Sequence, residues 1–460
     1  MLSYILRRLL LMFPTLLGIT LVVFFTMAAS PGGISAQSLI DGFGMNPQEK
    51  KALHDYYNRR YGLDQPAPLQ YLRWLNNVSP IGFEVSESGS YERFSLTKGS
   101  DLGESFRYGR KVADLLAERV PITLLLNILT IPIIYLIAIT VGVRAATDRG
   151  GRFDVSSSVV MLGLWSVPTM LTGVLLIGFF ASDQYWHWFP TSGLSDRGAL
   201  DMPFMPHWPS LFDVLTLFAT TMMGLWLGSL LARWPPLRWR AATAGGVGVV
   251  LAIWMTSSLS IPKAGWIYGL LILLFTPLLY ALARSDYDGL RQSVFGLIGA
   301  SVGLIVGTMW GQEGFIRGFM LDRLWHLALP VICLSYGGFA FLARLTRSAI
   351  LENLQADYAR TARAKGVGES TVLWTHVFRN SLLPLITVSA SLLPGLLGGS
   401  VIVESIFSID GMGKLVVEAV KGRDRELVLS ITLISGLLTL LGYLLADLLY
   451  AMADPRVSYD

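Results

Sequence analysis

Residues 343–384 read ARLTRSAILENLQADYARTARAKGVGESTVLWTHVFRNSLLP and form the longest polar, basic interval in the second half of the chain. Apolar segments long enough to span a membrane lie on both sides of this interval. An excess of Lys and Arg in a loop between two spans predicts that the loop faces the cytoplasm. The basic residues are Arg344, Arg347, Arg360, Arg363, Lys365 and Arg379, and the acidic residues are Glu352, Asp357 and Glu369.

The same interval predicts a short helix, a turn and a second helix. Four alanines favour the first helix, and two glycines then interrupt it. The second helix is amphipathic and is predicted to end before Pro384. Such a rigid element at the membrane face suits contact with a soluble partner, although an ordinary positive-inside loop explains the residue content equally well. The alanines are Ala356, Ala359, Ala362 and Ala364, and the glycines are Gly366 and Gly368.

The composition is that of a polytopic, all-α membrane protein. Hydrophobic residues make up 53% of the 460 residues and charged residues only 15%, whereas a soluble globular domain is nearer to about 25% charged. The net charge of +4 comes from basic residues scattered between spans, which argues against a nucleic-acid surface. Cys333 is the single cysteine and lies in an apolar segment, so a disulfide within the chain is excluded.

Ten spans are predicted, six in a core and four in an insertion. Arg7 and Arg8 precede the first apolar run, which is too long for a cleaved signal and predicts a cytoplasmic N-terminus. Pro132 is expected to kink the second span, and Pro168 lies inside the third. The core spans are predicted at residues 9–29, 120–143, 159–181, 324–342, 385–403 and 428–450.

The inserted apolar runs lie between the third and fourth core spans, and each approaches the ~20 residues that cross a bilayer. An even number of added crossings leaves the basic interval on the same side of the membrane. The inserted runs are Leu211–Ala232, Ala241–Leu259, Gly265–Ala283 and Ser293–Trp310. The predicted organisation is an N-terminal span (1–29), an external region (30–119), core spans two and three (120–193), the insertion (194–321) and core spans four to six (322–460).

The external region is expected to contain helices near Pro47–Tyr61 and Pro68–Asn77 that cap the outer mouth. It is interpreted either as a docking surface for a substrate-binding protein or as a packed lid without a partner. Asp447 in the last span is expected to be solvated or paired near the inner boundary rather than to contact substrate.

Motifs for catalysis are missing from the sequence. It contains no G-x-x-x-x-G-K-[ST] phosphate loop, no HExxH pair and no G-x-S-x-G nucleophile motif. The five histidines, at positions 54, 187, 207, 326 and 376, are scattered, so no catalytic, cofactor or metal site is predicted in the chain. Any ATP and Mg²⁺ are therefore expected on another polypeptide.

Two adjacent motifs, DYARTARAKGV and HVFRNSLLP, resemble the cytoplasmic coupling loop of ATP-binding-cassette importer permeases, in the branch for dipeptides, oligopeptides and nickel. The general loop begins Glu-Ala-Ala, whereas Arg360, Thr361 and Ala362 occupy those places here, with Gly366 as the following glycine. Further similar segments are RYGLDQP (60–66), DLGESFR (101–107) and VESIFSIDGMG (403–413). RFDVSSS (152–158) and the DPR of the tail are most similar to the microcin-C-type oligopeptide permeases.

The resemblance implies a type I importer fold and a non-catalytic permease subunit for peptides or similar solutes. It implies four kinds of partner: a second homologous permease, two ATPase subunits, a periplasmic substrate-binding protein and the lipid bilayer of the bacterial inner membrane, with both termini cytoplasmic. An ATP-independent transporter or channel is the alternative. The implied ATPase-coupling residues are Asp357, Tyr358, Ala359, Arg360, Thr361, Ala362, Arg363, Lys365, Gly366 and Val367, and the external-gate candidates are Glu404, Asp410, Gly411 and Gly413.

Overall fold

The computed structural model describes residues 2–30, 47–85, 91–205, 211–233, 288–309, 318–397 and 401–453, with a few single positions between 239 and 273. Within these ranges the chain is helical apart from one hairpin and the connecting loops. It divides into two compact units, which we describe separately: unit 1 contains Met1–Thr172 and Pro330–Asp460, and unit 2 contains Gly173–Leu329.

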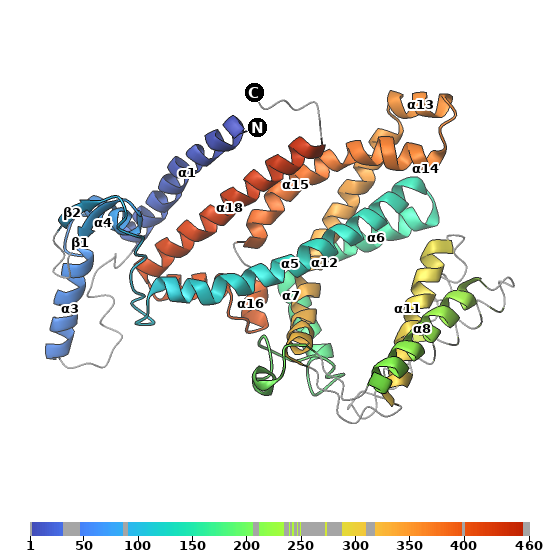
Figure 1. The fold of residues 1–460 in the computed structure, drawn as a ribbon, viewed down its shortest axis with the longest axis horizontal. Helices are drawn as coiled ribbons and strands as arrows, with labels where there is room; N and C mark the ends of the chain where they lie inside the picture. The colour runs from blue at the N-terminus through green and yellow to red at the C-terminus, as the bar shows by residue number, and fades with distance from the viewer. Residues whose placement is uncertain are drawn as a thin grey trace. The chain divides into compact units, whose positions relative to one another are not determined.

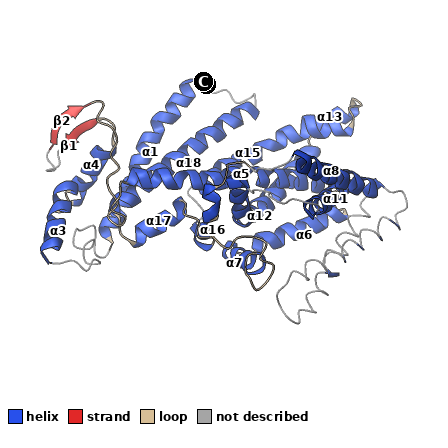
Figure 2. Ribbon diagram, turned by 60° about the horizontal axis from the view of Figure 1, so that its bottom comes forward, coloured by secondary structure: helices blue, strands red, loops and turns tan. Residues whose placement is uncertain are grey.

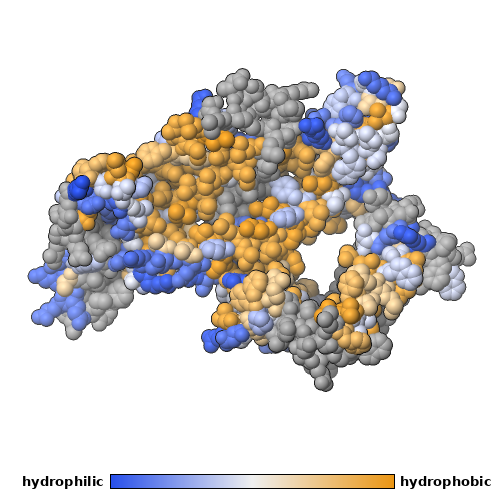
Figure 3. Space-filling view, in the orientation of Figure 1, coloured by the Kyte–Doolittle hydropathy of each residue, from blue (hydrophilic) through white to orange (hydrophobic). Residues whose placement is uncertain are grey.

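Among the described residues, five helices are long and apolar enough to cross a membrane. They are α1 (Leu2–Ala29), α5 (Val112–Thr147), α8 (Leu211–Arg233), α12 (Gly318–Leu354) and α18 (Arg425–Ala453). Their surfaces carry many exposed large apolar side chains, such as Leu10, Phe13 and Leu136. Figure 3 shows this apolar surface over the helices of unit 1. In lipid such side chains are favourably placed, because the bilayer core is as apolar as they are.

The predicted third span is two helices instead of one. Helices α6 (Arg152–Ser166) and α7 (Thr169–Phe180) meet at an angle of 95°. Val167 between them is extended, with φ −79° and ψ 125°. Pro168 is the cause, because a proline ring disfavours helical geometry in the residue before it and removes a backbone donor. By contrast, Pro132 lies inside α5, which continues to Thr147.

The helices of unit 1 place three chain segments on one side. Helices α1 and α18 are antiparallel neighbours, since Arg8 pairs with Asp447 at 2.9 Å while Phe24 packs near Leu429. The pairing of Asp447 agrees with the sequence-based expectation. Helices α5 and α18 begin in a shared apolar cluster and run away from it. Accordingly, the start of α1, the end of α18 and the short helix α13 (Asp357–Ala364) lie on the same side of unit 1 (Figure 1).

The opposite side of unit 1 carries the shorter elements. They are α3 (Pro47–Tyr61), α4 (Ala67–Val78), the antiparallel strands β1 (Gly82–Val85) and β2 (Tyr91–Ser95), α16 (Val401–Ile406) and α17 (Met412–Lys421). The two helices predicted in the external region are confirmed, whereas the hairpin was not predicted. Asn76 of α4 holds the hairpin, because its side chain exchanges hydrogen bonds of 2.8 and 2.9 Å with the backbone of Phe83. The hairpin lies beside α4 in Figure 2.

Unit 2 includes the end of α7, the 3₁₀ turn η1 (Arg197–Asp201), α8, α11 (Asp288–Met309) and the start of α12. Helices α8 and α11 approach each other at glycines, with Gly224 against Gly299 and Gly228 against Phe295. Small residues permit such contact between membrane helices. These helices correspond to the first and last predicted inserted runs. The runs Ala241–Leu259 and Gly265–Ala283 lie almost entirely outside the described residues, so the count of ten spans stays a prediction.

Candidate functional site

The basic interval folds into a short helix with a glycine turn, as the sequence predicts. Helix α12 ends at Leu354, α13 begins at Asp357, and Gly366 follows with φ +78°. The N–H groups of Gly366 and Val367 donate to the carbonyls of Arg363 and Ala362. This pair of bonds is a Schellman motif, in which the residue with positive φ is usually glycine because it has no Cβ to clash.

The helix that follows the turn does not end before Pro384. The segments α14 (Glu369–Thr371), the π-helix η2 (Val372–Phe378) and α15 (Arg379–Leu397) follow one another without a break. The prediction of a helix end before Pro384 is therefore wrong. Proline removes one backbone bond, but neighbouring groups in membrane helices compensate for that loss, so the rule for soluble helices does not carry over. The predicted fifth span thus begins within an already formed helix.

Helix α13 has a buried and an exposed face. Ala359 is fully buried and Ala362 nearly so, and both belong to an apolar cluster that joins α13 to three other helices. Alanine leaves room for this close approach. The partners are Val143 and Ala146 of α5, Ile350 of α12, and Val372 and Val377 of η2. The exposed face presents Asp357, Arg360, Thr361 and Lys365.

Two other predicted coupling residues have side chains that contact the last turn of α12. The guanidinium of Arg363 donates to Glu369 at 2.8 Å and to the backbone carbonyl of Leu354 at 3.2 Å. The hydroxyl of Tyr358 donates to the side-chain oxygen of Asn353 at 2.5 Å. Leu354 and Asn353 are in the last turn of α12, so Arg363 and Tyr358 brace α13 against the helix that precedes it.

Helix α5 connects this element with the opposite side of unit 1. Its 36 residues correspond to about 54 Å at about 1.5 Å per residue. It lies against α12 at two glycines. A Cβ on Gly142 would be 2.5 Å from the Cβ of Thr346 and 2.8 Å from the carbonyl oxygen of Ala343, and one on Gly338 would be 2.8 Å from Ile134. These contacts fix the spacing of α5 and α12 near α13.

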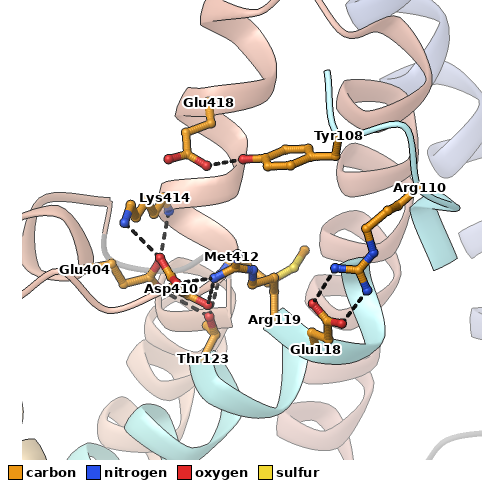
Figure 4. A network of polar contacts seen from close by, with 10 residues as sticks. All are labelled: Tyr108, Arg110, Glu118, Arg119, Thr123, Glu404, Asp410, Met412, Lys414 and Glu418. Atoms are coloured by element: carbon orange, nitrogen blue, oxygen red, sulfur yellow. Dashed lines mark hydrogen bonds and ion pairs between the residues drawn. The ribbon is translucent and has the colours of Figure 1, made fainter. Parts of the chain in front are cut away.

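At the other end of α5, the candidate gate residues Glu404 and Asp410 lie beside the first turn of α17 (Figure 4). The carboxylate of Glu404 is fully buried and accepts hydrogen bonds from the backbone N–H of Lys414 at 2.9 Å and from the hydroxyl of Thr123 at 3.2 Å. Thr123 in turn accepts the N–H of Met412 at 2.9 Å. A carboxylate is stabilised at a helix N-terminus by the unsatisfied N–H groups there.

Glycine is required at two positions of this turn. A Cβ on Gly411 would lie 2.5 Å from the carboxyl carbon of Glu404, and one on Gly413 would lie 2.8 Å from the backbone nitrogen of Val401.

Burial raises the pKa of Glu404, and the N–H and hydroxyl donors offset that rise in part.

Asp410 is held from two sides at the edge of the same turn. Lys414 contacts one of its carboxylate oxygens at 2.8 Å, and Arg119 of α5 contacts the other at 3.0 Å. The structure thus brings together Glu404, Asp410, Gly411 and Gly413, which the sequence singled out. It adds Thr123 and Arg119, whose participation no local signal in the sequence indicated.

A second buried carboxylate on the same side was also missed. Asp424 accepts the hydroxyl of Ser105 at 2.5 Å and the backbone N–H of Arg107 at 3.2 Å. Nearby, the hydroxyl of Tyr108 donates to Glu418 of α17. The segment DLGESFR is therefore the contact between the external loop and the start of α18. Burial raises the pKa of Asp424, and the hydrogen bond from Ser105 is the largest opposing influence.

Comparison with known proteins shows the family of this chain. A family model described as the inner membrane component of binding-protein-dependent transport systems matches residues 138–459, and the model of the corresponding N-terminal part matches residues 1–127. The expected family is thereby confirmed.

Three relatives align over all of this chain and over 98–100% of their own lengths. The chain is similar to the oligopeptide transport system permease protein AppB of Bacillus subtilis, with 28% identity and full coverage of both chains. It is similar to the di/tripeptide permease DppB of Pseudomonas aeruginosa, also at 28% and full coverage, and to the peptidoglycan transport permease YejB of Agrobacterium fabrum, at 25% over all of this chain and 98% of the relative. The chain therefore belongs to the family of inner membrane components of binding-protein-dependent transport systems.

Proposed function

We propose that this multi-pass inner membrane protein imports peptides or peptide-like solutes, forms half of the translocation pathway, and meets an ATPase subunit through α13. Peptide transport is supported by the names of the oligopeptide and di/tripeptide relatives. In this family the membrane component is non-catalytic, and ATP hydrolysis lies on separate subunits. The proposed assembly contains a second homologous permease, two ATPase subunits that bind ATP and Mg²⁺, and a periplasmic substrate-binding protein.

The observation that carries the proposal is the path of α5. Its last turns contact α13 and η2 through Val143 and Ala146, and its first turns contact the candidate gate through Arg119 and Thr123. A displacement of α13 therefore moves a single helix that reaches Glu404 and Asp410. We assign α13 and both termini to the cytoplasm and the α16–α17 turn to the periplasm, in keeping with the basic character of residues 343–384.

The exposed face of α13 is the surface offered to the ATPase. We expect α13 to sit in a groove on the surface of an ATPase subunit. When the two ATPase subunits close on ATP, this groove would move and carry α13 with it. The buried face of α13 would then pass the displacement to α5 and α12. Coupling of this kind requires two states of the helix bundle that differ by only a few kcal/mol, so that nucleotide binding selects between them.

Charge reversal on the exposed face tests the proposal. With the full complex in proteoliposomes, we expect Arg360→Glu to reduce peptide uptake at least tenfold while the ATPase subunits still hydrolyse ATP. Arg149→Glu is the matched control, because Arg149 is also exposed, in the loop after α5, but is not on α13. Normal uptake by Arg360→Glu, or equal loss in both variants, would contradict the assigned contact. Uptake by the permease without any ATPase would favour the ATP-independent alternative.

A further inference from the structure

Three side chains of unit 2, one of them far from the other two in the sequence, meet at the start of α12. Asp322 and His326 are four residues apart, so they lie on one face of the helix. Asp196, from the loop before η1, joins them, and one potential ligand atom from each residue lies within 4.8 Å of the others. The separation of 126 residues between Asp196 and Asp322 explains why scattered histidines in the sequence gave no indication of this cluster.

One hydrogen bond places a proton on Nδ1 of the histidine. Nδ1 of His326 is 2.9 Å from the backbone carbonyl of Asp322. A carbonyl can only accept, so Nδ1 carries a proton, and when the ring is neutral Nε2 presents its lone pair. That lone pair faces a carboxylate oxygen of Asp196 at 3.4 Å. Two acceptors in this position repel each other unless a cation or a second ring proton lies between them.

The arrangement also matches the usual surroundings of a metal ligand. A metal-bound histidine typically donates its other N–H to a carbonyl or carboxylate, as Nδ1 does here. Two ligands at about 2.1 Å from one tetrahedral ion are separated by about 3.4 Å. The backbone N–H of Asp196 donates to Asp322 at 2.9 Å, which holds the loop close to the helix.

We propose that Asp196, Asp322 and His326 bind one divalent transition-metal ion. One imidazole nitrogen with two carboxylate oxygens suits Zn²⁺ and similar borderline ions, whereas Mg²⁺ and Ca²⁺ prefer oxygen ligands alone. His326 and Asp322 are almost fully buried, while the side chain of Asp196 is 59% exposed. The ion therefore enters from the side of Asp196, keeps a water molecule as a further ligand, and fastens the loop before η1 to the first turns of α12.

Zinc titration of the purified full-length chain tests the site, with the affinity tag removed and the metal stripped by a chelator. Isothermal titration calorimetry is expected to give one equivalent of Zn²⁺, with affinity at least 100-fold above that for Mg²⁺. Binding should also change the tryptophan fluorescence, because Trp325 precedes His326 and its indole N–H donates to the carbonyl of Trp188 at 3.0 Å.

Three variants separate this site from other histidines. His326→Ala is expected to weaken Zn²⁺ binding at least tenfold. His187→Ala is the matched control with unchanged affinity, because His187 is exposed and its Nδ1 contacts Asp183 and the carbonyl of Ala181, which do not belong to the cluster. Asp196→Asn, at an exposed position, should also lose at least tenfold and serves if His326→Ala does not fold. Absence of a Zn²⁺ equivalent in the parent chain, or equal affinity in Asp196→Asn, overturns the proposal and leaves an imidazolium held by two carboxylates.

Discussion

Arg363 has a different structural role from the other basic residues on and just after α13. Arg360 and Lys365 are exposed, whereas Arg363 spans from Glu369 to the last carbonyl of α12. All three are coupling candidates because their segment resembles the coupling loop of importer permeases. Only the structure separates the one that braces the helix from those that face outward.

A charge exchange distinguishes bracing from direct contact with the ATPase. Arg363→Glu places two carboxylates side by side and is expected to lower uptake while ATP hydrolysis continues. The partly exposed pair contributes only about 0.2–1 kcal/mol to stability, so insertion and folding should be nearly normal. Adding Glu369→Arg restores opposite charges and should recover much of the uptake, measured in proteoliposomes. If the double variant transports no better than Arg363→Glu, the side chain contacts the ATPase instead of bracing α13.

Glu404 predicts a pH dependence of stability. Burial raises its pKa in the folded chain, so the folded state holds the proton more tightly than the unfolded state. The cost of the buried charge is fully present above the folded-state pKa and is relieved as pH falls toward the unfolded value of about 4.3. We expect Glu404→Gln to flatten this part of the dependence, followed as the thermal unfolding midpoint in detergent between pH 4.5 and 8.

The controls for this experiment come from the same turn and its neighbour. Asp410→Asn removes a carboxylate that is 53% exposed and should leave the pH profile almost unchanged. Asp424 has a raised pKa for the same reason, so adding Asp424→Asn to Glu404→Gln should flatten the profile further. An unaltered profile in that double variant would show that neither buried acid controls it.

Among the helices, α5 has one property that the sequence predicted, its membrane span, and one that it did not, its contacts with the candidate gate. Its apolar run predicted a span, but Arg119 and Thr123, at its polar start, were assigned no role. Local rules worked where the cause is local: residues 47–61 form the predicted helix, and Gly366 adopts the positive φ expected of a glycine turn. They failed at Pro384, because tolerance of proline depends on surrounding helices. Contacts such as Thr123 with Glu404 depend on tertiary packing across 281 residues.

Close packing of α5 on α12 is open to a steric test. Gly142→Ala places a methyl group against the Cβ of Thr346 and the backbone of Ala343, and overpacking of this kind costs about 1–3 kcal/mol. We expect a lower unfolding midpoint and weaker uptake. Gly163→Ala in α6 is the matched control, since no atom lies within 4 Å of the added methyl. Equal behaviour of the two variants would argue that α5 and α12 separate without consequence.

At the scale of the whole protein, one side of unit 1 gathers α13, the N-terminal end of α1 and the C-terminal end of α18. The opposite side gathers α4, the hairpin, and the turn between α16 and α17. The sequence predicted this division, because the order of apolar spans and the basic residues between them can be read along the whole chain without knowledge of tertiary contacts. Hydropathy did not reveal the 95° bend between α6 and α7, because the two helices together are apolar enough to pass for one span.

The assignment of these two sides to cytoplasm and periplasm predicts opposite thiol labelling. Cys333, the single natural cysteine, is buried, so it contributes little background with a membrane-impermeant maleimide. Thr361→Cys lies on the exposed face of α13 and should react in inside-out vesicles but not in spheroplasts. Thr97→Cys, exposed just after β2, should react in spheroplasts and not in inside-out vesicles. The reverse pattern would place α13 outside the cell, where no ATPase could reach it, and the proposed coupling through α5 would have to be abandoned.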